Sequence, residues 1–280
     1  MITVTGASGQ LGRLVLAELL TRLPADQITA MVRDPAKLSD LAGTGLRIVQ
    51  GDYNAPETLA PALAGTDRLL IISGNEFGRR VEQYQALVAA AEAAGVGYIA
   101  YTSILRASEN PMYLAQDHRA AEGLIAATGL PHAFLRNGWY SENYAGSIAQ
   151  GAGTGGFIGA SGAGRIAGAA RADYAAAAAK VIAEGLTGTY ELGGPAYTME
   201  DLAATIGAVA GREVSYQNLT PEAFTAALIG VGLPEGFAQV LGDSDRFAAE
   251  GWLDTGSTQL AELIGRPVTP LAEVVKAVLG

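Results

Sequence analysis

The sequence predicts an α/β fold, a doubly wound parallel sheet followed by a smaller, mainly helical C-terminal lobe. Two observations in the first half point to the sheet. Short apolar runs alternate with helical stretches, and these runs are continuous instead of alternating with polar residues. Continuous apolar runs are typical of strands whose two faces are both covered by helices. A third observation marks the second lobe: after about Tyr144 the sequence becomes rich in glycine and alanine and the regular alternation of strands and helices ends.

The first half alternates between strands and helices. The expected strands are, in order, "ITVTG", "ITAMVR", "LRIVQGD", "DRLLIISG", "GYIAYTS" and "HAFLRNG". The expected helices include "QLGRLVLAELLTRL", "VEQYQALVAAAEAAG" and "DHRAAEGLIAATG", and Gly95 and Gly129 end the last two. Such alternation predicts a sheet that binds ligands at the carboxyl ends of its strands.

The second half is less regular. The stretch "AGSIAQGAGTGGFIGASGAG" is rich in Gly and Ala and predicts neither a helix nor a strong strand. Helices are expected at "RADYAAAAAKVIAEG", "YTMEDLAATIGAVAG", "TPEAFTAALIGVG", "STQLAELIG" and "TPLAEVVKAVLG", with short strands at "TYELGG" and "EVSYQNL". Thr198 and Asp201 fit a capping box, and Thr220 fits an N-cap with Pro221 at the first helical position. We interpret this half as a lobe that covers a substrate.

Three glycines stand where the first strand passes into the first helix. There, glycine allows a tight turn and a close approach of a pyrophosphate to the backbone, and the helix N-terminus offers N–H groups to the anion. This context predicts a Rossmann-type NAD(P)-binding domain over residues 1–144, with residues 145–280 as the smaller α/β lobe. The boundary is approximate, and we expect the lobes to interleave. The cofactor-binding residues expected in this turn are Gly6, Ser8, Gly9, Gln10, Leu11 and Gly12.

The end of the second strand indicates which dinucleotide binds. An acidic residue there holds the ribose of NAD, whereas an arginine accommodates the 2′-phosphate of NADP. Arg33 leaves this strand and Lys37 follows, so we expect NADPH, with NADH as a weaker alternative. Two other interpretations remain: Arg33 is a solvated loop charge, or Asp34 serves NAD. Asp52, after the third strand, is expected either to accept from the adenine amino group or to cap its loop.

Further candidates follow the later strands. The loop after the fourth strand is expected beside the nicotinamide ribose, its alternative being an ordinary glycine turn. Arg171 is expected either to reach a cofactor phosphate or to pair with Asp173. With Arg171, the remaining expected cofactor-binding residues are Ser73, Gly74, Asn75, Glu76, Phe77, Thr102, Ser103, Asn137 and Gly138.

Several longer motifs carry a resemblance. "VRDPAK", "GDYNAPETL", "GVGYIAYTS", "LRNGWYSENY" and "RADYAAAAAKVI", together with the glycine-rich start, resemble the NmrA-like atypical short-chain dehydrogenases. Within that family the chain is most similar to the type 2 NAD(P)H:quinone oxidoreductases, with triphenylmethane reductase as a near relative. The resemblance extends nearly from end to end, including "YQNLTPEAFTAAL", "GLPEG" and "DSD". It implies NADPH binding, no flavin, and two-electron reduction of quinones.

The usual catalytic pair of short-chain dehydrogenases is missing. Four residues after Tyr113 stands Asp117, where that family carries a lysine. An aspartate raises the pKa of a neighbouring tyrosine instead of lowering it, which argues against alcohol oxidation and sugar epimerisation. A quinone needs less help, because hydride addition yields a stabilised aromatic product.

The loop "NGWYSENY" follows the sixth strand and suits stacking on a flat substrate. The alternative is that Trp139 and Tyr140 wedge the two lobes together, and for Trp139 the two interpretations stand equal. The expected catalytic residues are Tyr140 and Asn143, as substrate contacts, and His118, as a proton donor or a residue that orients the nicotinamide; the alternative for His118 is a structural role.

Composition excludes several other classes. The chain has 280 residues, a net charge of −10 and no basic cluster, which argues against nucleic acid as a partner. It has no cysteine and only two histidines, so no metal site is expected. No apolar run reaches the roughly 18 residues of a membrane span, and no signal peptide is recognisable. We expect a soluble, cytoplasmic protein, and its small-residue helices permit a homodimer.

The sequence thus predicts an NADPH-dependent, flavin-free reductase that transfers hydride to a quinone or a similar conjugated acceptor, relying on proximity and orientation. Two alternatives remain at this point. One is a non-catalytic, NmrA-like redox sensor that binds NAD(P), and the other is an NADPH reductase of a different small molecule, such as a dye, an enone or a ketone.

Overall fold

The first compact unit is built on a parallel sheet. The computed structural model describes residues 1–76 and 78–280. The strands lie in the order β3-β2-β1-β4-β5-β6-β8, so the order reverses at β1 and β4. Pairs β1–β2, β2–β3, β1–β4 and β4–β5 are parallel, as predicted. The strands are β1 (Ile2–Val4), β2 (Ile28–Val32), β3 (Arg47–Gln50), β4 (Arg68–Ile71), β5 (Tyr98–Ile104), β6 (His132–Asn137) and β8 (Gly188–Leu192).

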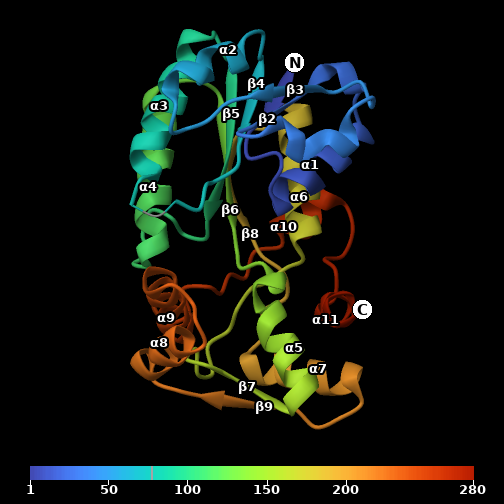
Figure 1. Cartoon of the computed structure of the whole chain (residues 1–280), viewed down its shortest axis with the longest axis vertical. Helices are drawn as coiled ribbons and strands as arrows, with labels where there is room; N and C mark the ends of the chain where they lie inside the picture. Colours follow the sequence, from blue (N-terminus) through green and yellow to red (C-terminus); the bar gives the residue numbers. More distant parts are fainter. Residues whose placement is uncertain (77) are drawn as a thin grey trace. The chain divides into compact units, whose positions relative to one another are not determined.

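Helices cover both faces of this sheet, which explains the continuous apolar strands (Figure 1). One face carries α2 (Leu59–Leu63), α3 (Arg80–Ala93) and α4 (Tyr113–Ala127), and the other carries α1 (Gln10–Leu20) and α6 (Arg171–Glu184). The core beneath α2, α3 and α4 includes Leu63, Leu87, Ile99 and Ile125, all almost fully buried. The doubly wound sheet is thereby confirmed.

Short 3₁₀ helices complete the connections. They are η1 (Ala25–Gln27), η2 (Pro35–Leu41), η3 (Pro56–Thr58) and η4 (Ser141–Tyr144). Gly95 and Gly129 adopt φ of 74° and 69° just after α3 and α4, which confirms them as the residues that end these helices.

The second compact unit is mainly helical. The capping box of Thr198 and Asp201 is present at the start of α7, and Thr220 caps α8 with Pro221 directly after it, as predicted. Strands β7 and β9 form a separate parallel pair. The elements are α5 (Ala145–Thr154), β7 (Gly156–Gly159), α7 (Met199–Ala210), β9 (Ser215–Asn218), α8 (Pro221–Gly230), α9 (Glu235–Ala249), α10 (Gln259–Ile264) and α11 (Leu271–Leu279).

The Gly/Ala-rich stretch after Tyr144 was predicted to lack regular structure, and that prediction is wrong. It forms α5 and β7. A side chain on Gly151 would meet Val214, Phe157 and Ile206 at 3.0–3.5 Å, so the glycine lets neighbouring chain approach the helix closely. Helix α5 packs against α7 and α11, and β7 pairs with β9, so both elements depend on partners far along the sequence.

The short strand "TYELGG" was expected in the second lobe, whereas β8 lies at the edge of the main sheet, beside β6. The first compact unit comprises Met1–Ile104, Asp117–Arg136 and Tyr174–Tyr190, and the second comprises Leu105–Gln116, Asn137–Asp173 and Glu191–Gly280. A functional division near residue 144 stays a prediction. Within residues 1–76 and 78–280, no helix combines the length and the apolar character that crossing a membrane requires.

Candidate cofactor and active site

The turn between β1 and α1 has the backbone that the three glycines predict. Gly6 adopts a φ of 59°, a conformation that favours glycine, and its carbonyl oxygen accepts a hydrogen bond from the Gly9 N–H at 2.9 Å. A Cβ on Gly12 would lie 2.4 Å from that same oxygen. Gly9 begins α1 without a side-chain cap, and the first turn of α1 holds no acidic residue. These glycines therefore shape a cradle at a helix N-terminus that suits an anion.

The other residues of this turn differ in exposure. Gly6, Gly9 and Gln10 are exposed and Ser8 is half-buried. Leu11 is only 7% exposed, so its side chain belongs to the core and its backbone is what it can offer a ligand.

Arg33 follows β2 directly, as predicted, and its side chain is 61% exposed. Its Nη1 donates to Oε1 of Glu76, in the loop after β4, at 2.8 Å. Asp34 instead caps η2 by accepting from the Ala36 N–H at 3.0 Å. Arg33 is thus the side chain at the end of β2 that extends toward the neighbouring loop.

Asp52 stands just after β3. Its Oδ1 accepts from the Asn54 N–H at 2.9 Å, and its own N–H donates to Thr58 Oγ1 at 2.9 Å. The loop-capping interpretation of Asp52 has this geometry in its favour, and its contact with adenine stays a prediction.

The loop after β4 is held by hydroxyl groups of the sheet and of α3. The Ser73 N–H donates to Thr102 Oγ1 at 2.9 Å, and the Gly74 N–H donates to the Tyr84 hydroxyl at 3.2 Å. Asn75 is exposed. Phe77, also expected to bind cofactor, lies outside the described residues. Anchored in this way, the loop presents its exposed part at the carboxyl end of β4.

Ser103 has a different surrounding from Thr102, although both are buried. Its hydroxyl donates to Glu122 Oε1 at 2.6 Å, and Glu122 in turn forms an ion pair with Arg136 at 2.7 Å. The Ser103 hydroxyl is therefore engaged inside the protein, and its role as a cofactor contact stays a prediction.

His118 is buried in a polar cluster on the α3–α4 face of the sheet. Its Nε2 lies 3.1 Å from an Arg80 guanidinium nitrogen and its Nδ1 lies 2.8 Å from the Tyr101 hydroxyl. Because arginine can only donate, Nε2 accepts and Nδ1 carries the proton. Burial, and secondly the charge of Arg80, lower the pKa of His118 well below its ordinary value. The cluster stabilises a neutral imidazole, and a catalytic role for His118 stays a prediction.

The cluster also includes Asp117, four residues after Tyr113. Its carboxylate lies 3.6 Å from Nη1 of Arg80, whose side chain is 2% exposed. Arg80 and Tyr84 were not expected from the sequence. The "GRRVEQYQ" stretch shows an ordinary helix start, and nothing in it indicates that an arginine turns inward.

The loop after β6 brings the predicted substrate residues together within the second unit. Asn137 is 4% exposed, and its Nδ2 donates to the Tyr140 hydroxyl at 3.3 Å. Its Oδ1 is a buried acceptor without a hydrogen-bond partner in the part of the chain that the structure describes. Burial raises the pKa of Tyr140, so this phenol is a neutral hydrogen-bonding group. The Gly138 N–H is engaged with the Leu192 carbonyl at 2.7 Å, and the half-buried Trp139 accepts from the Ala169 N–H through its own carbonyl.

Arg171 joins this loop. Its guanidinium stacks 4.9 Å from the centre of the Tyr140 ring and donates to Asn143 Oδ1 at 3.4 Å, and its N–H donates to the Glu142 carboxylate. Asp173, its expected alternative partner, is fully buried and paired with Arg266 at 2.7 Å. A polar face of Tyr140, Asn143 and Arg171 thus results, and it can donate to and accept from a carbonyl-bearing substrate.

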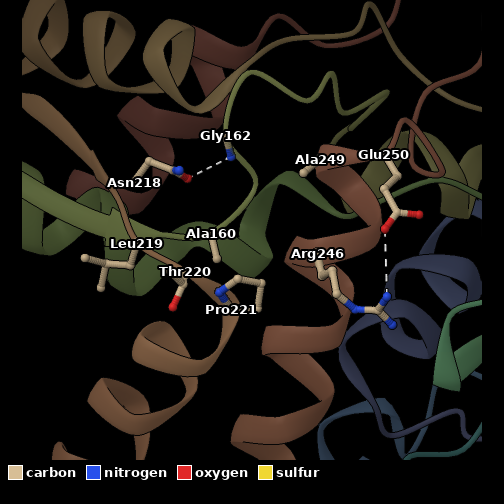
Figure 2. A pocket seen from close by; sticks show the side chains of 9 residues that line it. All are labelled: Ala160, Gly162, Asn218, Leu219, Thr220, Pro221, Arg246, Ala249 and Glu250. Atoms are coloured by element: carbon tan, nitrogen blue, oxygen red, sulfur yellow. Dashed lines mark hydrogen bonds and ion pairs between the residues drawn. The ribbon is translucent and has the colours of Figure 1, made fainter.

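A separate cavity of about 490 Å³ lies elsewhere in the second unit (Figure 2). Its polar groups include the Thr220 hydroxyl and Arg246, which pairs with Glu250 at 3.8 Å, and its apolar wall includes Leu219 and Ala249. None of the residues predicted to bind cofactor or substrate lines it.

Known proteins are similar to this chain in both sequence and architecture. "Quinone oxidoreductase 2" of Escherichia coli (strain K12) is 49% identical over 278 residues, which cover 98% of this chain and 97% of that protein. The crystal structure of an Escherichia coli NADPH-dependent quinone oxidoreductase complexed with NADPH superposes with a TM-score of 0.97, at 48% identity and with all of both chains covered.

Triphenylmethane reductase from Citrobacter sp., complexed with NADP(H), gives a TM-score of 0.95 at 37% identity, with 99% of this chain and 100% of that chain covered. These similarities confirm the resemblance that the sequence motifs indicated. A model of the NAD(P)H-binding family matches residues 6–185, more than half of the chain, in the same region as the glycine cradle. The protein accordingly belongs to the NAD(P)H-binding family.

Proposed function

We propose that the protein is an NADPH-dependent, flavin-free reductase that transfers hydride to a quinone or a similar conjugated acceptor. The observation that carries the proposal is the near-complete similarity to an NADPH-dependent quinone oxidoreductase, 48% identical over the whole chain, in a protein whose β1–α1 turn has the glycine cradle of a dinucleotide site.

The residues present fit the cofactor. The cradle of Gly6, Gly9 and Gly12 leaves no room for a Cβ at Gly12 and suits the pyrophosphate beside the N-terminus of α1. Arg33, exposed at the end of β2, suits the 2′-phosphate through charge-assisted hydrogen bonds. NADPH, when bound, supplies the hydride.

The chain's own residues bind the quinone, orient it and polarise its oxygen. The Tyr140 hydroxyl can donate a hydrogen bond to a quinone oxygen, and Arg171, stacked on the Tyr140 ring, adds positive charge close to it. Asn137 positions Tyr140 through its amide. Hydride transfer to a quinone gives a hydroquinone anion, whose oxygen can take its proton from solvent. Turnover therefore does not require the lysine of the usual catalytic pair, and Asp117 at that position is compatible with it.

The proposal also covers the compartment of the protein, nucleic-acid binding and the oligomeric state. The absence of cysteine and the sequence pI of about 4.7 support a cytoplasmic protein that does not bind nucleic acid. The small-residue helices permit a homodimer without requiring one.

The test is an oxidation assay with the purified protein. NADPH or NADH is mixed with 1,4-benzoquinone, and the absorbance of the reduced nicotinamide is followed against a protein-free control. We expect protein-dependent loss that is faster with NADPH. Loss no faster than the control, with cofactor binding still detectable by calorimetry, would instead support a non-catalytic redox sensor.

A further inference from the structure

Glu76, in the loop after β4, is held by side chains of three other segments. Its Oε1 accepts from Arg33 at 2.8 Å, and its Oε2 accepts from Asn54 Nδ2 and Gln83 Nε2, both at 3.0 Å. Gln83, on α3, is 3% exposed and also donates to Asn54 Oδ1 at 3.0 Å. The carboxylate is therefore fixed in place beside Arg33, and a rotamer change would cost it several hydrogen bonds.

This carboxylate is charged at neutral pH. Hydrogen bonds from Asn54, followed by those from Gln83 and by the positive charge of Arg33, hold the pKa of Glu76 below its ordinary value. Its side chain is 33% exposed and that of Arg33 is 61% exposed, so a ligand can reach the ion pair from solvent.

An anion that binds Arg33 must share the guanidinium with Glu76. A phosphate oxygen that accepts a hydrogen bond from Arg33 lies close to the Glu76 carboxylate, because both oxyanions contact the same guanidinium group. Two negative groups this close repel each other, and the repulsion is only partly screened by solvent. A ligand without a phosphate at that place avoids this cost.

We propose that Glu76 is a specificity-determining residue, which competes with the 2′-phosphate of NADPH for Arg33 and thereby lowers the preference for NADPH over NADH. The inference rests on the proposed function, in which Arg33 binds that phosphate. It assigns opposite effects to two side chains in contact: Arg33 favours NADPH, and Glu76 limits how strongly it is favoured.

The test compares the full-length wild-type protein with Glu76→Gln. The substitution keeps the size of the side chain and removes its charge. The carbonyl oxygen of the new glutamine can still accept a hydrogen bond from Asn54 or Gln83. Its NH₂ group, placed toward Arg33, cannot accept a hydrogen bond from the guanidinium, so the ion pair with Arg33 is lost. Dissociation constants for NADPH and NADH are measured by calorimetry, and their ratio, Kd(NADH)/Kd(NADPH), is the readout.

We expect this ratio to rise about tenfold in Glu76→Gln, and the increase to be larger at low than at high ionic strength. The matched control is Glu82→Gln, which removes one negative charge from α3 at a side chain that is 76% exposed and paired with Arg79. The control ratio should change less than twofold. A merely structural role of Glu76 would not give a salt-dependent change in this ratio.

An unchanged or lower ratio in Glu76→Gln would overturn the proposal, a lower one because Glu76 would then orient Arg33 for the phosphate. Glu76→Ala serves as a second neutral variant if Glu76→Gln does not fold, as judged by circular dichroism. Failure of the proposed function is distinguishable, since the wild type would then bind the cofactors but show no protein-dependent oxidation of NADPH by 1,4-benzoquinone, whereas the ratio of dissociation constants tests Glu76 alone. A wrong assignment of Arg33 would show separately, as equal weakening of both cofactors in Arg33→Ala.

Discussion

At the scale of single residues, the proposed preference for NADPH depends on the charges at the end of β2. Arg33 donates to Glu76, and this pair joins residues that are far apart in the sequence. The sequence predicts Arg33 as the contact of the 2′-phosphate from its place after the second strand, because the ribose of a dinucleotide lies at the carboxyl end of that strand. Its pairing with Glu76 was not predicted, since no local pattern indicates which loop folds back toward it.

The role of Arg33 is tested by Arg33→Ala. We expect NADPH binding to weaken by about 1.5–3 kcal/mol, the contribution of hydrogen bonds between charged groups, with NADH almost unchanged. Calorimetric titration of both cofactors measures the difference. Similar losses for both cofactors would show that Arg33 does not bind the 2′-phosphate.

Tyr140 is tested by removing its hydroxyl alone. In Tyr140→Phe we expect kcat with 1,4-benzoquinone to fall about tenfold, the cost of one lost hydrogen bond in the transition state, with an unchanged Kd for NADPH. Tyr190→Phe is the control, because that hydroxyl donates to the Thr187 carbonyl at the surface. Unchanged kinetics in Tyr140→Phe would remove Tyr140 from the mechanism.

Asp245 gives the protein a pH-dependent stability. Burial raises its pKa to about 6, whereas the unfolded value is about 3.9. The folded state therefore binds more protons than the unfolded state between these values, and the stability contributed by this group is lost as pH rises from about 4 to 6.

Asp245→Asn removes this loss while keeping an oxygen that can accept from the Ala160 N–H. We expect the variant to be more stable than wild type by about 1–3 kcal/mol at pH 7, with a much smaller difference at pH 4. Urea unfolding at both pH values measures this. A difference that is equal at pH 4 and pH 7 would contradict the titration of Asp245.

At the scale of elements, local signals predicted the helix ends and the strands of the first unit. The capping box at Thr198 and the N-cap at Thr220 depend only on neighbouring residues, so the sequence was sufficient for both. Helix α5 and strand β7 were missed, because the many glycines weaken the local helix and strand signals and the partners α7, α11 and β9 come much later in the sequence.

The cradle of α1 can be tested by two glycine substitutions in different helices. Gly12→Ala places a Cβ 2.4 Å from the Gly6 carbonyl oxygen, so we expect a loss of about 1–3 kcal/mol in unfolding free energy and weaker cofactor binding. Gly123→Ala, in the exposed interior of α4 with no atom within 4 Å of the new Cβ, should stabilise by about 0.5–1 kcal/mol. Equal effects of the two substitutions would contradict the close packing at Gly12.

At the scale of the whole molecule, the strand–helix alternation predicted the doubly wound sheet, and the similarity to solved relatives confirms it. The place of β8 could not be predicted from its short run of residues. The chain leaves the sheet after β6, forms α5 and β7, and returns through α6 to the edge of the same sheet. Long-range return of this kind has no local signal.

We propose that the protein itself catalyses hydride transfer from NADPH to a quinone, without a flavin. The absorbance spectrum of the purified protein is first checked for flavin. The most direct measurement then follows NADPH loss and hydroquinone formation in one reaction. We predict a flavin-free spectrum and equal molar amounts of NADPH consumed and hydroquinone formed, faster than in the protein-free control. Normal NADPH binding with no protein-dependent hydroquinone formation would contradict the claim.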